Sequence, residues 1–284
     1  MKKLGLVITD GVGYRNFIMS DFISESINQF DAITIYSGLP ISAYNDIPSS
    51  KITIKELDVF VEGKATWFFR KWKELAHLQK NHSFYGMKDN LVSGYPKSNS
   101  IRSLLIKGIY FFTHFIHSDW SIAVAEKRQF SSFSKHKITR SYLQLLKEDK
   151  PTHVFFTHQR PPYLAPFLYA AQQVKIPVSS FIFSWDNLAS KGRMLGTFDY
   201  FLVWSQLMKT ELMYFYPKVS EDKVKVVGTP QFEPYVLPKY ETTAEEFQLK
   251  FNLDPNTKII CYSCADVSIG QNDPIVIRAI ADAF

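Results

Sequence analysis

A repeated order of apolar run, polar loop and helix constrains the fold of this chain more than any other feature. Apolar runs at 4–9, 31–37 and 151–157 are bounded by turn-forming residues, as strands buried on both faces are. Helical periodicity separates most of these runs, and strands that alternate with helices build parallel sheets with crossover connections. The sequence therefore predicts an α/β fold, a Rossmann-like parallel sheet with flanking helices. The other predicted strands are 52–57, 176–183, 198–204 and 223–227.

The length of 284 residues is long for one domain and comfortable for two. We expect an N-terminal Rossmann-like domain over 1–230, interrupted by a helical insertion at about 62–149, and a proline-containing linker over 231–240. Residues 241–284 are expected to start a second, C-terminal domain, with its first strand at 258–263. One strand and one helix cannot bury a parallel sheet, so we expect this second Rossmann-like domain to be truncated.

Composition narrows the range of partners. The net charge of +6 favours an anionic partner such as a sugar nucleotide, a phosphorylated lipid or a membrane surface, although many ordinary proteins are mildly basic. No zinc-ligand spacing, nucleic-acid motif or dense Lys/Arg run is present, so neither a metal site nor a nucleic-acid partner is expected. The Cys261-x-x-Cys264 pair lies in an apolar strand pattern, which favours buried thiols over metal or redox chemistry. The absence of a disulfide framework is typical of a reducing cytoplasm.

The insertion contains an unusual concentration of aromatic and basic residues. Segment 62–80 is predicted to be a helix with Trp67 opposite its apolar face. That Trp suits a membrane interface or an acceptor groove, but packing beneath a neighbouring loop is the preferred interpretation. Residues 85–100 are rich in Gly, Lys, Ser, Asn and Pro, which predicts a long loop. Residues 101–116 form an aromatic, basic helical pattern, and no window is long enough for a transmembrane helix.

Three polar loops follow predicted strands of the sheet, at 10–16, 158–160 and 184–193. The carboxyl ends of parallel strands meet at one edge, and ligands of open α/β sheets bind outside that edge. Each loop alone is weak evidence, but their coincidence predicts a ligand cleft. The candidate substrate-binding residues in these loops are Gly11, Gly13, Arg15, Asn16, Arg160, Trp185, Asp186, Asn187, Lys191 and Arg193.

The first of these loops contains the pair Gly11-x-Gly13 between a strand and a helix. Such glycines let the backbone approach a ligand, and the helix N-terminus favours anions. The full dinucleotide fingerprint fails because Asn16 stands where the third Gly would be, so dinucleotide binding is disfavoured. A plain tight turn explains the pair equally well.

Catalytic roles are open to His158 and Asp10, with Asp186 as a third candidate base. Each also has a structural interpretation. The His could bond to backbone, Asp10 could cap the following helix, and Asp186 with Asn187 could organise their own turn. Trp185 could stack on a sugar or base, or anchor its loop in the core. The Arg and Lys residues of the loops could hold phosphate or carboxylate groups.

Three spans, 184–193, 199–205 and 224–232, contain motifs that resemble those of a known family of proteins. They contain Ser-Trp-Asp-Asn, a strand leading into Trp-Ser, and Val-x-Val-x-Gly-x-Pro at the exit of the domain. This rhythm resembles the end of the N-terminal domain in GT-B-type glycosyltransferases, among them bacterial surface-polysaccharide enzymes and glycerophosphotransferase-like relatives. The resemblance covers about residues 150–263, and the first strand with its Gly loop only loosely.

That resemblance implies two facing Rossmann-like domains, with the acceptor on the N-terminal side, a nucleotide-sugar donor mainly in the C-terminal half, and neither obligatory metal nor cofactor. The expected function is transfer of a sugar from a nucleotide-sugar donor to a surface-polysaccharide or lipid-linked acceptor. The alternatives are a glycerophosphotransferase-like or nucleotide-sugar epimerase activity on the same fold, and a non-catalytic module that binds glycan or membrane. The expected location is cytoplasmic, with peripheral contact at the inner face of the membrane as an open alternative.

Overall fold

The computed structural model describes residues 1–45, 47, 50–264 and 270–283. The chain separates into two compact units, Met1–Val236 and Leu237–Phe284. The first unit contains the sheet. The second contains helices α11 (Ala244–Lys250) and α12 (Asp273–Ala283).

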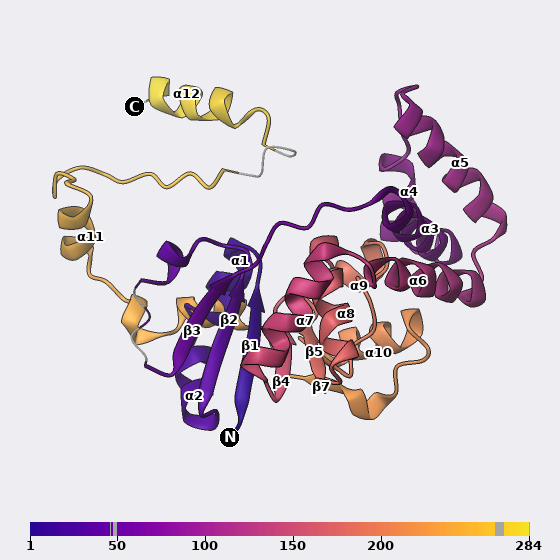
Figure 1. Ribbon diagram of the computed structural model, residues 1–284. Helices are drawn as coiled ribbons and strands as arrows, with labels where there is room; N and C mark the ends of the chain where they lie inside the picture. The colour runs from indigo at the N-terminus through magenta and orange to yellow at the C-terminus, as the bar shows by residue number, and fades with distance from the viewer. Residues whose placement is uncertain (46, 48–49, 265–269, 284) are drawn as a thin grey trace. The chain divides into compact units, whose positions relative to one another are not determined.

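The first unit is built on one parallel sheet of seven strands in the order β3-β2-β1-β4-β5-β6-β7 (Figure 1). All six neighbouring pairs are parallel. This order confirms the predicted Rossmann-like α/β fold. The strands are β1 (Lys3–Ile8), β2 (Ala32–Ser37), β3 (Ile52–Glu56), β4 (His153–Phe156), β5 (Val178–Phe181), β6 (Tyr200–Val203) and β7 (Val224–Val226).

Two hydrophobic cores lie on opposite faces of the sheet, because successive side chains of a strand point to opposite sides. On β1, Leu6 and Ile8 pack with Phe17 of the first helix. Val7 packs on the other face with Phe167. Burial on both faces explains why the central strands read as continuous apolar runs in the sequence.

Five helices, α3 to α7, lie between β3 and β4 and form the insertion. In Figure 1, α3, α4, α5 and α6 gather beyond the carboxyl ends of β4 and β5, whereas α7 packs beside α8. The α-helices of this unit are α1 (Gly11–Phe17), α2 (Phe22–Gln29), α3 (Lys64–Lys80), α4 (Tyr85–Ser93), α5 (Ile101–Phe115), α6 (Asp119–Phe133), α7 (Lys137–Asp149), α8 (Ala165–Gln173), α9 (Asn187–Ser190) and α10 (Gln206–Phe215). The 3-10 helices of the chain are η1 (Ile41–Tyr44), η2 (Pro162–Leu164), η3 (Glu221–Lys223), η4 (Pro230–Tyr235) and η5 (Pro238–Tyr240).

The loop predicted at 85–100 is wrong in its first half, where α4 forms. Tertiary packing stabilises this helix. Met87 is fully buried, and Asn90 donates from Nδ2 to the carbonyl of Ser190 at 3.0 Å. A Cβ atom on Gly86 would come within 2.7 Å of the Cβ of Ser190, so α4 lies directly against α9. One buried apolar anchor gives no periodicity that a sequence pattern could reveal.

The strand predicted at 258–263 is also wrong, since residues 258–264 have no regular secondary structure. A parallel strand needs the backbone of a neighbour, and the described residues of the second unit contain no other strand to provide it. Cys261 and Cys264 are consequently exposed free thiols rather than buried ones. The second Rossmann-like domain stays a prediction. Among the described residues, no helix combines the length and apolar character required to traverse a bilayer.

Candidate functional site

The three predicted loops lie at one edge of the sheet, around the point where strand order reverses. The chain builds outward from β1 through β2 to β3 and then returns to the other side of β1 as β4. Such a reversal opens a crevice at the carboxyl ends of the two central strands, and open α/β proteins bind their ligands there. The loops after β1, β4 and β5 border this crevice. They carry Asp10, His158 and Asp186.

The loop after β1 is fixed by Asp10, the N-cap of α1. Its Oδ1 accepts a hydrogen bond from the backbone N–H of Gly13 at 2.8 Å, and its Oδ2 accepts one from the Thr9 hydroxyl at 3.1 Å. A Cβ atom on Gly13 would lie 2.8 Å from Oγ1 of Thr157, which itself donates to the carbonyl of Val7. Gly13 therefore lets α1 approach the end of β4, whereas a Cβ on Gly11 would meet nothing.

Replacing Gly13 by Ala is expected to lower the free energy of unfolding by about 1–3 kcal/mol, because the added methyl must displace a buried, hydrogen-bonded Thr157. Gly11→Ala is the matched control and should change stability by no more than about 0.5 kcal/mol. Urea titration of both variants measures the difference. Equal stability of the two variants would contradict the close approach.

Arg15 and Asn16 follow on α1, but they differ in access. The Asn16 side chain is fully buried, and its Nδ2 has no hydrogen-bond partner among the described residues. Its Oδ1 accepts a hydrogen bond from Nε of Arg15 at 3.2 Å. Asn16 thus orients Arg15, and only the Arg, which is partly exposed, can reach a ligand at the surface.

His158 lies at the end of β4 with its ring stacked on Phe183 of the next loop, at 4.0 Å between centroids. Its Nδ1 accepts a hydrogen bond from the backbone N–H of Arg160 at 3.1 Å, so the neutral ring carries its proton on Nε2. Burial lowers the pKa of His158 to about 4, although the nearby carboxylate of Asp10 acts in the opposite direction. His158 is therefore a neutral hydrogen-bond donor at pH 7, an arrangement that favours positioning of a substrate oxygen over proton abstraction.

Gln159 was missed as a site residue, although it holds two of the loops together. Its side chain is buried, with Oε1 accepting from the backbone N–H of Phe183 at 3.0 Å and Nε2 donating to Oδ1 of Asn187 at 3.1 Å. Its carbonyl also accepts from the N–H of Leu195. A Gln between a His and an Arg gives no sequence signal of burial, because Gln is usually exposed.

The Gln159→Leu variant is expected to lose about 2–3 kcal/mol of stability, since it leaves the N–H of Phe183 and the amide oxygen of Asn187 without partners. Gln172→Leu is the control, because Gln172 makes one hydrogen bond to the exposed carbonyl of Thr197. That control should lose less than about 1 kcal/mol. Thermal unfolding of both variants measures this difference. A Gln159→Leu protein as stable as the control would show that the Gln159 hydrogen bonds do not hold the two loops together.

In the loop after β5, the carboxylate of Asp186 is hydrogen-bonded to residues of its own loop. Asp186 accepts hydrogen bonds from the hydroxyls of Ser184 at 2.6 Å and Ser190 at 3.1 Å. Burial alone would raise the pKa of Asp186, but these bonds, the Asn187 amide and the Lys191 charge lower it. Asp186 and Asn187 thus organise their own turn, one of the two interpretations left open by the sequence. Trp185, by contrast, is 69% exposed and available to a ligand.

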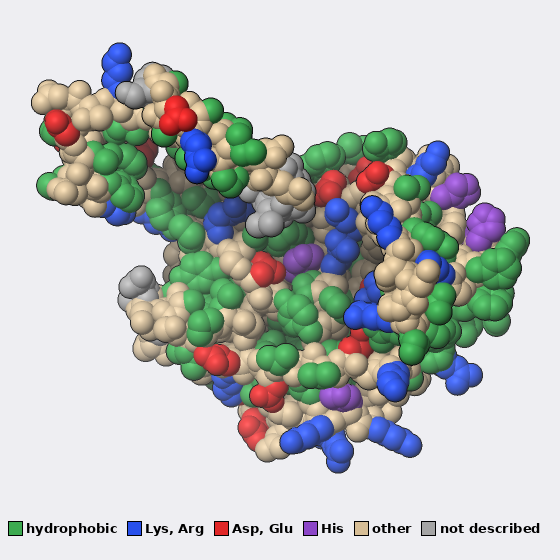
Figure 2. Space-filling model, turned by 90° about the horizontal axis from the view of Figure 1, so that it is seen from above, with side chains coloured by type: hydrophobic (Ala, Val, Ile, Leu, Met, Phe, Trp, Pro, Cys, Tyr) green, Lys and Arg blue, Asp and Glu red, His purple; other side chains and the backbone are tan. Residues whose placement is uncertain are grey.

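A cavity of about 310 Å³ lies beside this crevice, with walls from α3, α4, α5 and the loops after β4 and β5. Figure 2, which looks onto this edge of the sheet, shows Lys and Arg side chains gathered around a hollow. The charged residues lining the cavity are Arg70, Lys71, Glu74, Arg160 and Arg193.

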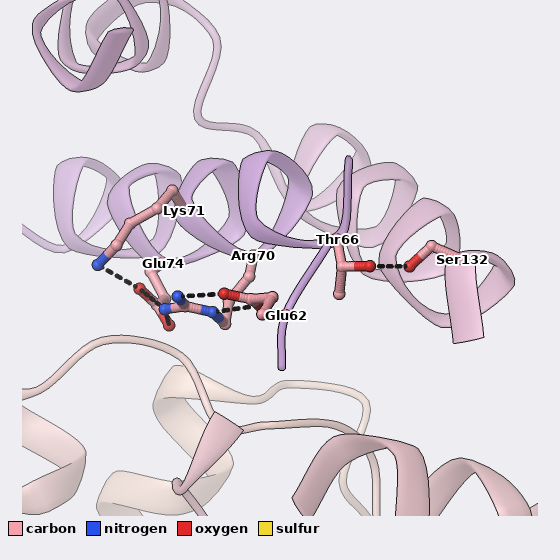
Figure 3. A network of polar contacts seen from close by, with 6 residues as sticks. All are labelled: Glu62, Thr66, Arg70, Lys71, Glu74 and Ser132. Atoms are coloured by element: carbon pink, nitrogen blue, oxygen red, sulfur yellow. Dashed lines mark hydrogen bonds and ion pairs between the residues drawn. The ribbon is translucent and has the colours of Figure 1, made fainter. Parts of the chain in front are cut away.

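Part of this charge is already neutralised by Glu74 of α3 and by Glu62, which precedes that helix (Figure 3). Arg70 donates two hydrogen bonds of 2.7 Å to Glu62 and a third to Glu74, and Lys71 also pairs with Glu74. Burial would raise the pKa of Glu74, but the Lys71 and Arg70 charges hold it below its usual range. The Glu74 carboxylate is therefore ionised and paired with residues of its own helix.

The two arginines contributed by the loops are less neutralised. Within the described residues, the Arg160 guanidinium makes no hydrogen bond, and burial lowers its pKa. Arg193 contacts Glu126 at 3.4 Å and lies 4.7 Å from the ring centroid of Tyr216. Arg160 thus remains free to take an anionic group at the cavity, while Arg193 is held against α6. Lys191 is half-buried.

A second cavity of about 440 Å³ lies between α6, the 193–197 loop and residues 216–219. It is larger, but no residue of the loop after β4 lines it. The smaller cavity adjoins Arg160 and the strand ends, so we place the candidate site there.

Comparison with known proteins finds similarity to solved structures at low sequence identity. No protein-family model and no curated protein sequence matches the chain. It is similar to the solved structure of UDP-GlcNAc 2-epimerase from Methanocaldococcus jannaschii, at 11% identity and a TM-score of 0.38, over 80% of this chain and 45% of that one. It thus spans less than half of that protein. An ABC transporter periplasmic solute binding protein from Actinobacillus succinogenes 130z with bound D-allose matches at 13% identity and a TM-score of 0.16, over 81% of this chain and 96% of that one. The strand order of the chain itself establishes its class, a Rossmann-like parallel α/β fold.

Proposed function

We propose that this chain forms the acceptor side of a glycosyltransferase that uses a nucleotide-sugar donor. The supporting observation is the convergence of three polar strand-end loops at the switch point of a doubly wound sheet, next to a cavity with an uncommitted arginine. Open α/β sheets bind ligands at this position, and arginine suits phosphate groups.

In the proposed reaction, Asp10 is the base. Its carboxylate removes the proton of an acceptor hydroxyl whose oxygen His158 positions through Nε2–H. The oxygen forms a bond to the anomeric carbon of the donor sugar, and the bond from that carbon to the diphosphate breaks. The nucleoside diphosphate leaves with the electron pair. Arg160 stabilises anionic groups of the substrates.

Asp10 is preferred to His158 as the base because of hydrogen bonding. One ring nitrogen of His158 already accepts from the Arg160 backbone and the other carries the proton, so no lone pair is free. The Asp10 carboxylate has two oxygens with about four acceptor sites, of which the N–H of Gly13 and the Thr9 hydroxyl occupy two.

The test is product analysis. The protein is incubated with a panel of nucleotide sugars, with a nucleotide-activated glycerol and with a lipid-linked acceptor fraction, and nucleotide release and new glycoside or phosphodiester are measured against an Asp10→Asn control. Acceptor-dependent release with a glycosidic product supports the proposal. An epimer without release, or a phosphodiester product, would replace it with the epimerase or glycerophosphotransferase-like alternative. Absence of turnover and binding across the panel would refute all three.

A further inference from the structure

Helix α5 presents an apolar face to solvent. Its outward residues follow helical spacing, and Phe111 and Phe115 are 62% and 68% exposed. Figure 2 shows hydrophobic side chains massed at the edge of the molecule where α5 lies in Figure 1. The exposed apolar residues of this surface, which we call the α5 face, are Ile101, Leu104, Leu105, Phe111, Phe112, Phe115 and Ile116.

An ordinary surface helix has one apolar stripe, which faces the core, whereas α5 is apolar on its exposed side as well. The buried residues of α5 are Ser103, Ile109, Tyr110 and Thr113, and the Thr113 hydroxyl donates to the carbonyl of Ile109 within the helix. Large aliphatic and aromatic groups therefore remain at the surface in addition to those that pack against the core. A contiguous exposed patch of this kind marks a binding surface rather than a scattering of single residues.

The charged residues of the segment that contains α5 have one sign. No Asp or Glu occurs from Leu91 to Ser118, whereas Lys97, Arg102 and Lys107 do. Asp119, at the start of α6, lies just beyond this segment and pairs with Lys80. Exposed aromatic groups bordered by basic side chains and without acidic ones complement an anionic lipid surface, where aromatic rings settle at the headgroup level.

We propose that α5 binds in the plane of an anionic membrane interface, with the α5 face immersed and the basic residues at the lipid headgroups. A helix of 15 residues is about 22 Å long, too short to span the hydrocarbon core but suited to lie along it. The opposite side of α5 contributes Ile106 and Tyr110 to the cationic cavity. If the proposed function holds, membrane binding brings that cavity to the surface where a lipid-linked acceptor resides.

Trp67 does not belong to this surface. It is half-buried, it packs against the core, and the guanidinium of Arg102 lies 5.9 Å from its ring centroid. Trp67 thus lies beneath α5, which agrees with the packing interpretation of the sequence and transfers the expected membrane contact to α5.

Vesicle flotation tests this proposal with the full chain. Wild type should float with phosphatidylcholine vesicles containing 30% phosphatidylglycerol at low salt, and at least tenfold less with phosphatidylcholine alone. Phe111→Glu/Phe115→Glu should reduce binding to anionic vesicles at least tenfold. Leu207→Glu/Tyr214→Glu is the matched control, with equal added charge on residues of α10 that are 69% and 61% exposed, and should bind within twofold of wild type.

Circular dichroism and thermal melting establish that both double variants fold. Arg102→Gln/Lys107→Gln should weaken binding and flatten its salt dependence. Failure of wild type to bind anionic vesicles, or equal loss in the α10 control, would overturn the proposal. Sedimentation that shows a wild-type dimer converted to monomer by Phe111→Glu/Phe115→Glu would assign the face to a second copy instead. None of these readouts requires catalysis. Membrane binding through α5 can therefore be refuted while the proposed glycosyltransferase function stands, and the function can be refuted while membrane binding stands.

Discussion

Asp10→Asn is expected to lower turnover of the nucleotide sugar by about 10²–10⁴-fold, the contribution that a positioned general base typically makes. The amide cannot accept the proton of the acceptor hydroxyl. Asn is as good an N-cap as Asp, so the hydrogen bond to Gly13 and the start of α1 should survive. Steady-state kinetics combined with urea unfolding separate the chemical effect from any loss of stability.

His158→Gln is the companion variant, because a Gln amide can still donate a hydrogen bond where Nε2–H of His158 does. Its turnover should fall by no more than about tenfold, the cost of weakening one hydrogen bond. If His158→Gln lost as much activity as removal of a general base implies while Asp10→Asn stayed active, the two roles would have to be exchanged.

Acidification is expected to destabilise the protein strongly between pH 6.5 and 4 through its buried histidines. Burial and the Arg193 and Lys80 charges lower the pKa of His77 to about 3, and His158 is lowered to about 4. The unfolded chain takes up these protons near pH 6.5, whereas the folded chain does not until its lower pKa values are reached. Stability is thus fully present above pH 6.5 and is lost as pH falls, at about 1.4 kcal/mol per pH unit for each histidine.

His77→Leu removes one of these groups and should flatten the dependence by about 1.4 kcal/mol per pH unit, while His158 and His153, whose pKa burial also lowers, still contribute. Nε2 of His77 is buried without a partner among the described residues, so the apolar replacement costs little at pH 7. At pH 4.5 the variant should be more stable than wild type by about 2–3 kcal/mol. His114→Leu, at an exposed position, is the control. Urea midpoints from pH 7 to 4 measure the effect, and parallel curves for His77→Leu and wild type would contradict it.

The sheet was predictable because its central strands are buried on both faces and therefore read as short apolar runs. The three loops were predictable because polar residues directly follow three of those apolar runs. Helix α4 was not predictable, since its single buried anchor, Met87, carries no period. The strand expected at 258–263 was wrong for the opposite reason. Its sequence has the apolar pattern of a strand, but the described residues of the second unit contain no neighbouring strand with which it could pair.

The site was predictable as a set of loops but not as a set of roles. A His at a strand end is a reasonable base until the backbone N–H of Arg160 is seen to occupy its Nδ1. Asp186 is a reasonable base until the side chains of Ser184, Asn187 and Ser190 are seen to donate hydrogen bonds to its carboxylate. The cavity walls supplied by Arg70 and Glu74 come from α3, far from Arg160 in sequence, and only tertiary packing brings them together. Gln159 and the α5 face also became apparent only once burial was known.

Hydrogen–deuterium exchange tests most directly whether the switch-point crevice is the substrate site. The protein is compared with and without a saturating nucleotide sugar and acceptor that support turnover. Exchange should slow in the three loops, at 10–16, 158–160 and 184–193, and in α3. Protection confined to residues 119–130 and 216–219 around the larger cavity, with the three loops unchanged, would contradict the account.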